Sequence, residues 1–146
     1  MDDDRRLQPA RHDDPPASAL LDQLHAKRLE PHRELRGHDF FPPTEELAQI
    51  PALYATDGLP MTEKQVMLHY YAAGSDWWVC ELDPRTGTAF GYVCLGDPYN
   101  AEWGYFELNE LCSTLIPTSP PLIVERDLNW SPRPVSACDL PGRRVG

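Results

Sequence analysis

Apolar and aromatic residues concentrate in four short runs in the middle of the chain, at residues 65–72, 76–82, 89–95 and 103–106. These runs are rich in valine, leucine, tyrosine, tryptophan and phenylalanine, which favour β-strands. The segments between them carry glycine, proline, aspartate and asparagine, which favour turns. Short strand-forming runs separated by such turns predict an antiparallel meander.

The second hairpin of this meander predicts how the side chains divide between two faces. Pairing Leu82 with Phe90 is the expected register, and successive residues of a strand point to opposite faces. One face then holds Trp78, Cys80, Tyr92 and Cys94, with Cys80 opposite Tyr92 and Trp78 opposite Cys94. The other face holds Trp77, Val79, Gly91, Val93 and Leu95. Since both sets are apolar, we expect both faces to be covered, one of them by helices.

Short helices flank the expected sheet. Residues 107–115 place Leu108, Leu111 and Leu115 at helical spacing. A shorter helix is expected over 45–50 with Thr44 as its N-cap, and residues 122–124 are expected to form a last short strand. The fold class is therefore α+β, with a four- to five-stranded, mainly antiparallel sheet and one or two short helices.

The same pattern predicts a single domain over residues 37–137. Residues 1–36 are expected to be a disordered or weakly helical extension, with a short helix over 17–30 that ends at Pro31. Residues 138–146 are expected to be a flexible tail. A chain of 146 residues is long enough for one domain with a hydrophobic core and too short for two comfortable ones.

The net charge of −10 lies almost entirely on the expected domain. Residues 37–137 carry 14 acidic side chains and 4 basic ones. Such a surface repels phosphate backbones, so we expect no direct contact with nucleic acid. No apolar stretch of 18 residues and no apolar leader is present, so the expected location is the cytoplasm, with no membrane partner.

Four cysteines, at positions 80, 94, 112 and 138, form no Cys-x-x-Cys pair. Zinc sites usually take their ligands in such close pairs, because one turn must aim two side chains at one ion. We therefore expect free thiols, no cofactor and no metal. His69, Cys80 and Cys94 could lie close together on neighbouring strands and bind a metal ion. The favoured interpretation is that His69 is a core histidine packed between aromatic residues.

Several motifs together resemble an uncharacterised "domain of unknown function" family that is common on bacterial plasmids, phages and integrative elements. The motifs are residues 78–84 (WVCELDP), 89–91 (AFG), 95–96 (LG), 102–105 (EWGY), 108 and 110–111 (L, EL), and 124–130 (VERDLNW). The likeness spans residues 50–135. The chain departs from the family's usual form in its longer N-terminal extension and at residues 112–114. The resemblance implies a mobile-element setting inside a bacterial host cell and no established activity.

Two functional alternatives remain beside a non-enzymatic role. Glu81, Asp83 and Asp127 could form the carboxylate set of a metal-dependent hydrolase, although Lys64 is the only lysine of the expected domain. An aromatic sheet face could bind single-stranded nucleic acid through Trp78, Tyr92 and Phe90. The hydrolase hypothesis requires the three carboxylates to converge in a pocket. The nucleic-acid hypothesis requires the aromatic face to be exposed. The chain offers no Ser/His/Asp arrangement and no phosphate-binding loop, so we expect no catalytic residues.

The favoured function is an acidic accessory or interaction protein of a phage or other mobile element, with a basic host or element protein as its partner. In a sharper version it mimics DNA, and its carboxylates occupy the phosphate positions of a host enzyme's groove. Four acids within fourteen residues that contain no lysine or arginine form the candidate interaction surface: Asp97, Glu102, Glu107 and Glu110. Separately, Glu125, Arg126 and Asp127 are expected to form a structural ion pair that fixes the final segment on the sheet.

Overall fold

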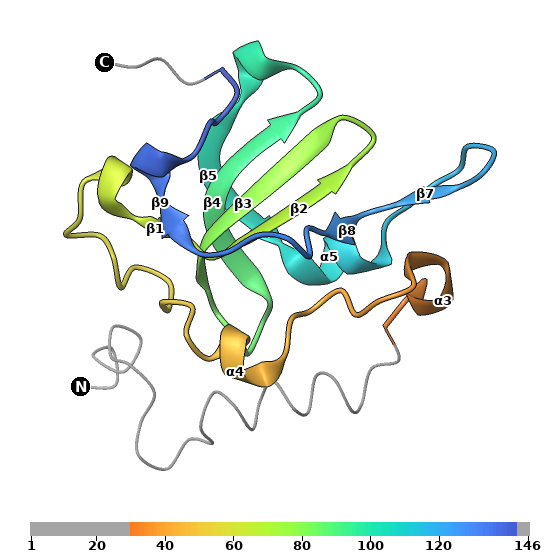
Figure 1. Ribbon diagram of the computed structural model, residues 1–146, viewed down its shortest axis with the longest axis horizontal. Coiled ribbons are helices and arrows are strands. Elements are labelled where there is room, and N and C mark those ends of the chain that lie inside the picture. The colour runs from red at the N-terminus through yellow and green to blue at the C-terminus, as the bar shows by residue number, and fades with distance from the viewer. Residues whose placement is uncertain (1–29, 143–146) are drawn as a thin grey trace, which may run out of the picture.

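A five-stranded antiparallel sheet forms the centre of the computed structural model, which describes residues 30–142 (Figure 1). The strand order is β5-β4-β3-β2-β8. Four of these strands follow one another as hairpins, so the predicted meander and the α+β class are confirmed. Their bounds are Leu68–Ala72 (β2), Ser75–Leu82 (β3), Thr88–Leu95 (β4), Glu102–Glu107 (β5) and Glu125–Arg126 (β8).

Two small two-stranded sheets and several short helices surround the central sheet. The small sheets pair Gln65–Val66 (β1) with Arg133–Pro134 (β9), and Leu115–Ile116 (β6) with Leu122–Ile123 (β7). The hairpin of β6 and β7 projects as an arm from the body of the molecule (Figure 1). The α-helices are Arg33–Arg36 (α3), Thr44–Leu47 (α4) and Leu108–Ser113 (α5), and the 3-10 helices are Met61–Glu63 (η1), Pro98–Asn100 (η2) and Val135–Ala137 (η3). Within residues 30–142, no helix has the length and apolar character needed to cross a membrane.

The predicted element boundaries need four corrections. The helix over 107–115 ends at Ser113, and Leu115, expected on its apolar side, is the first residue of β6. The run 65–72 is two strands, because β1 leaves the sheet to pair with β9. The helix over 45–50 is shorter and starts at Thr44 itself, with Pro43 at the N-cap position. The expected last strand at 122–124 pairs with β6 in the arm, and the fifth strand of the central sheet is β8, which pairs with β2.

Apolar cores cover both faces of the sheet, as the sequence predicted. On one face, residues from the N-terminal segment and α5 pack against the sheet, with Phe40 and Leu108 fully buried. The opposite face is covered by β1 and the C-terminal segment. Its buried members are Val66, Trp78, Cys80, Tyr92, Cys94, Val135 and Leu140.

The register of the β3–β4 hairpin differs from the predicted one. Leu82 pairs with Ala89 and Trp78 with Tyr92, and the register shifts by one residue between Val79 and Glu81. Cys80 is the extra residue of this β-bulge, which allows two successive side chains to leave the usual alternation. Cys80 keeps the face of Trp78, as the sequence predicted, and joins the core beneath the C-terminal segment. The bulge instead moves Leu82 to the face of Val79, where it joins the opposite core.

The folded region extends beyond the predicted domain at both ends. Arg36 is buried and its guanidinium donates to the carbonyls of Val124, Pro31 and Cys112, so α3 is part of the fold. At the other end, the hydroxyl of Tyr92 donates to the carbonyl of Pro141, and Leu140 is buried. The short helix expected over 17–30 lies almost wholly outside the described residues, as do residues 1–16 and 143–146.

Candidate functional site

Glu81, Phe90 and Tyr105 form a row across three strands of the sheet. Glu81 in β3 pairs with Phe90 in β4, which in turn pairs with Tyr105 in β5. Directly paired residues share a face, so the three side chains lie on the same side. Strict alternation from Val79 would send Glu81 to the opposite face, and the bulge at Cys80 aims its carboxylate at the aromatic pair instead.

The Glu81 carboxylate is buried, with 2% of the residue exposed, and it organises the loop before η1. Oε1 accepts a hydrogen bond from the Tyr54 backbone N–H at 2.8 Å, and Oε2 accepts one from the Thr56 N–H at 3.2 Å. The Thr56 hydroxyl also donates to Oε2. A buried carboxylate is stable only when such donors replace its water, so Glu81 fixes the loop to the sheet.

Lys64 completes this buried network from the other side. Its Nζ donates to the carbonyl oxygen of Thr56 at 2.6 Å and to Thr56 Oγ1 at 2.7 Å, and it lies 3.8 Å from Glu81 Oε2. Only 5% of Lys64 is exposed. The two opposite charges therefore neutralise each other, with Thr56 bonded to both.

The loop backbone held by this network is strained at Tyr54. Its φ is +71°, in the left-handed region that residues other than glycine, asparagine and aspartate rarely occupy. Such a conformation costs of order 1–3 kcal/mol and persists where the surroundings impose it. Here the Tyr54 N–H is held by Glu81, while the phenol stays 61% exposed. The strain thus presents an aromatic ring at the surface beside Tyr105, with 6.2 Å between the ring centroids.

A cavity of about 180 Å³ opens beside the network. Lys64 and Glu81 line it together with Phe90 and Tyr105. Asp57, Leu59 and Met61 complete the lining, and all three are exposed. We call this cavity and its rim residue Tyr54 the tyrosine pocket. It combines apolar and aromatic walls with a few fixed polar groups, which is the usual character of a binding site.

The electrostatics of the tyrosine pocket favour positive charge. Asp57 and Glu81 contribute two carboxylates and Lys64 one ammonium group. Desolvation and the neighbouring Tyr54 hydroxyl raise the pKa of the Tyr105 phenol, and Glu81 and Asp57 add to the effect. The part of this shift that comes from the Glu81 and Asp57 charges shows that both carboxylates act at the ring, and their negative charge favours a cation beside it.

The four acids of the candidate interaction surface divide into two groups at opposite ends of β5. Asp97 and Glu102 lie at its start, and Glu107 and Glu110 at its end and in α5. Glu102 and Glu107 are five residue steps apart along the strand, a distance of roughly 17 Å, and their opposite parity sends them to opposite faces. Two of the acids also have local bonds: Asp97 accepts from the Tyr99 N–H, and Glu107 accepts from the Thr88 hydroxyl.

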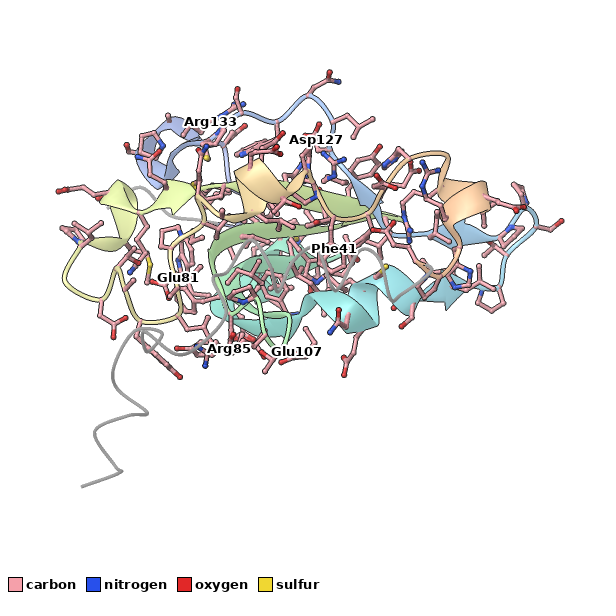
Figure 2. All side chains as sticks on the ribbon, turned by 90° about the horizontal axis from the view of Figure 1, so that it is seen from below. Phe41, Glu81, Arg85, Glu107, Asp127 and Arg133 are labelled. Atoms are coloured by element: carbon pink, nitrogen blue, oxygen red, sulfur yellow. The ribbon has the colours of Figure 1, made fainter. Side chains whose placement is uncertain are left out.

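The carboxylates of the metal-hydrolase set lie apart. Glu81 bonds the loop before η1, Asp83 bonds the Arg85 N–H in the β3–β4 turn, and Asp127 bonds His69. Glu81 and Asp127 are well separated in Figure 2. Of the three, only Glu81 lines the tyrosine pocket. Among residues 30–142, no group of three or more histidine, cysteine, aspartate and glutamate side chains is arranged to hold a metal ion.

His69 is held between two aspartates and between aromatic rings, not beside the cysteines. Nδ1 lies 2.9 Å from Asp127 and Nε2 lies 2.8 Å from Asp76. Its ring stacks on Trp78, with centroids 5.1 Å apart, and Trp130 lies on it at 5.5 Å. The favoured interpretation of a histidine packed among aromatic residues is confirmed. The four cysteines, all within residues 30–142, form no disulfide with one another.

The proposed stacking platform is largely covered. Trp78 and Tyr92 are buried beneath the C-terminal segment, and only Phe90 is part-exposed. Phe90 instead stacks on Trp103, with ring centroids 6.0 Å apart. Its exposed side belongs to the tyrosine pocket.

The ion pair expected among Glu125, Arg126 and Asp127 does not form. Glu125 lies 3.4 Å from His38 Nε2, Asp127 pairs with His69, and the Arg126 Nε donates to the carbonyl of Asp39. Neighbouring residues of a strand point to opposite faces, so adjacent side chains in β8 cannot readily pair with each other and instead contact groups on other elements. Backbone pairing of β8 with β2 fixes this segment on the sheet.

Sequence reasoning singled out Glu81 and Lys64 but did not bring them together, and it missed the loop at 51–60 as part of a site. A buried network needs its partners from distant segments, and no sequence spacing encodes the pairing of Glu81 with Tyr54 and Thr56. One signal was available. Glu81 is the only charged residue of the run 77–82, and an acid in such a run requires an internal partner.

The comparisons with known proteins identify a family and no relative of known activity. The sequence model of the family described as "Protein of unknown function (DUF2958)" matches residues 47–138. This range contains every residue of the tyrosine pocket. No curated protein and no solved structure matches the chain. Because the match covers more than half of its length, the chain belongs to the DUF2958 family.

Proposed function

We propose that this protein is a non-enzymatic accessory protein that binds a basic partner protein through the tyrosine pocket. The observation that carries this proposal is the exposure of apolar and aromatic side chains around a pocket of net negative charge. The exposed rim residues are Tyr54, Leu59, Met61 and Tyr105. Exposed clusters of this kind mark interaction sites, and tyrosine is among the residues that dominate binding energy at protein interfaces.

The state of the two buried charges supports binding over catalysis. A catalytic lysine or glutamate needs a lone pair or a proton that is available to a substrate. Lys64 instead donates to Thr56, Glu81 accepts from Thr56 and Tyr54, and the two charges form an ion pair at 3.8 Å. Their role in the proposed function is to hold the loop so that Tyr54 and Asp57 stay in place at the rim.

The overall charge supports a basic partner. The net charge of −10 attracts a positively charged protein over distances of a Debye length and accelerates its association. In the finer form of the proposal, which uses the resemblance to proteins of mobile elements, the partner is a host DNA-processing or defence enzyme. The carboxylates of one acidic pair, Asp97 with Glu102 or Glu107 with Glu110, then occupy positions that DNA phosphates take in the groove of that enzyme, and the DNA-mimicking protein inhibits it.

The test is affinity capture from a bacterial host lysate with three proteins: wild type, Tyr105→Ala and Tyr99→Ala. Tyr99 is the matched control, since it is 89% exposed in η2 and does not line the pocket. We expect wild type and Tyr99→Ala to retain the same basic protein, identified by mass spectrometry, and Tyr105→Ala to lose most of it. Raising the salt concentration should weaken retention, as electrostatic steering requires.

Two results would overturn the proposal. Equal recovery of the basic partner by Tyr105→Ala and by wild type would remove the pocket from the interface. Tight binding of wild type to DNA, measured directly by fluorescence anisotropy, would contradict the assignment of a basic protein as the partner.

A further inference from the structure

The chemistry of the tyrosine pocket identifies the group that it takes. Resting on the proposed function, we propose that the pocket binds the guanidinium group of an arginine side chain from the partner protein. Size, wall chemistry and charge each point to this ligand.

Size restricts the ligand to one side chain. The cavity holds about 180 Å³, whereas sites for cofactors and drug-sized molecules start at roughly 300 Å³. Each water of the liquid takes about 30 Å³, so the space equals that of a few water molecules. One long, unbranched side chain fills such a space, whereas most of a nucleotide would lie outside it.

The walls offer ring faces to a planar cation. Phe90 and Tyr105 meet at 5.1 Å between centroids with their planes tilted by 56°, so the two rings form a corner. Tyr54 extends the aromatic rim from the other side of Tyr105. A guanidinium stacks on such faces through cation–π attraction and through its own flat surface.

The charges select a cation and provide its counter-ion. The Lys64 ammonium donates two hydrogen bonds to Thr56 and lies 3.8 Å from the Glu81 carboxylate, so its charge is balanced within the buried network and calls for no anionic ligand. The Asp57 carboxylate, in contrast, accepts no hydrogen bond from any of residues 30–142, and it lines the pocket. It is the group that pairs with the incoming cation.

Arginine fits these groups better than lysine. Its fork of N–H donors bonds a carboxylate through two parallel hydrogen bonds while its plane lies on an aromatic ring. A lysine ammonium is more strongly hydrated and loses more on entering an aromatic pocket.

The test measures binding of short peptides to the full chain by NMR. The probes are acetylated, amidated Gly-Gly-X-Gly-Gly peptides in which X is arginine, lysine or citrulline, the neutral isostere of arginine. We expect the arginine peptide to shift the ring signals of Phe90 and Tyr105 saturably, and citrulline to bind at least about tenfold more weakly because it lacks the charge. The lysine peptide should bind more weakly than the arginine peptide.

Two variants locate the binding. Asp57→Asn should weaken arginine binding about tenfold, because it removes the counter-ion and keeps the shape. Glu46→Gln makes the same change of charge on exposed α4 and should leave the affinity unchanged. Equal affinity for arginine and citrulline, an unaltered affinity of Asp57→Asn, or the lack of any saturable shift would overturn the arginine assignment.

These outcomes are separable from a failure of the proposed function. If a basic partner is captured in a Tyr105-dependent manner but the arginine peptide does not bind selectively, only the assignment of arginine as the ligand is wrong. If the arginine peptide binds selectively and Asp57→Asn abolishes this binding, the ligand chemistry of the pocket is established. If the lysate then yields no partner, only the proposed partner interaction fails.

Discussion

Glu81 lies directly opposite Phe90 across β3 and β4. Strict alternation from Val79 would place Glu81 on the other face of the sheet. One extra residue, Cys80, produces this relationship. The bulge brings the one acidic side chain of the run 77–82 into contact with the loop before η1. Both the buried network and the tyrosine pocket depend on that single step in register.

Glu81 and Lys64 should be coupled in stability. Removing either charge alone leaves the other buried without its partner, which costs about 3–5 kcal/mol in comparable pairs. We expect Glu81→Leu and Lys64→Met each to lower the free energy of unfolding in urea by an amount of this order. The double variant should lose much less than the sum of the two single changes, and additive losses would contradict the coupling.

Gly91 should tolerate no side chain. A Cβ at this position would lie 1.7 Å from the carbonyl oxygen of Trp78, next to the bulge. Gly91→Ala must therefore displace backbone and should cost at least about 1–3 kcal/mol, measured by chemical denaturation. Gly104 is the matched control, because it pairs with Gly91 across β4 and β5 and a Cβ there meets nothing within 4 Å. Equal effects of the two substitutions would show that the close approach is not limiting.

Trp78 should be a principal contributor to the core beneath the C-terminal segment. Its ring is buried against His69 and Tyr92, so Trp78→Ala should lower the free energy of unfolding by about 3–5 kcal/mol. Urea denaturation followed by circular dichroism measures the loss. Tyr99→Ala, which removes an exposed ring, should change stability by less than about 0.5 kcal/mol. A loss below about 1 kcal/mol for Trp78→Ala would mean that the C-terminal segment does not cover the ring.

The Cys80 thiol should make the protein less stable at alkaline pH. Burial, with a further contribution from Glu81, raises its pKa from 9.0 to about 12, although Lys64 opposes the shift. The unfolded chain ionises this thiol above pH 9 while the folded protein holds the proton, so stability is full below pH 9 and falls between pH 9 and 12. The slope from this one group is about 1.4 kcal/mol per pH unit.

Cys80→Ala should therefore reduce the dependence of the free energy of unfolding on pH in this window. The buried Tyr70 hydroxyl, whose pKa is also raised by burial, acts in the same direction in both proteins, so the difference between them isolates the thiol. Urea titrations at pH 8, 9, 10 and 11 provide the comparison. Identical slopes for the two proteins would show that Cys80 ionises with its ordinary pKa in the folded state.

The sequence by itself determined the secondary structure around the centre of the molecule. Strand-forming runs separated by Gly- and Pro-containing turns specify hairpins because each hairpin depends on residues close in sequence. The spacing of Leu108 and Leu111 specified α5 in the same local way. Two apolar faces on one hairpin also required two covering layers, since exposed apolar area is unfavourable in water, and the structure confirms both cores.

Only the tertiary structure decided the site. A β-bulge shifts every later side chain by one position, and no local pattern around Cys80 marks it, so the register and the direction of Glu81 had to come from the packed sheet. The hydrogen bonds that join Glu81 to the backbone of Tyr54 and Thr56 link segments far apart in sequence. The acids at 97–110 cluster along the chain, yet the length and alternation of β5 separate them in space. Proximity in sequence sets hairpins and helices, whereas a pocket is set by which distant side chains the sheet brings to one face.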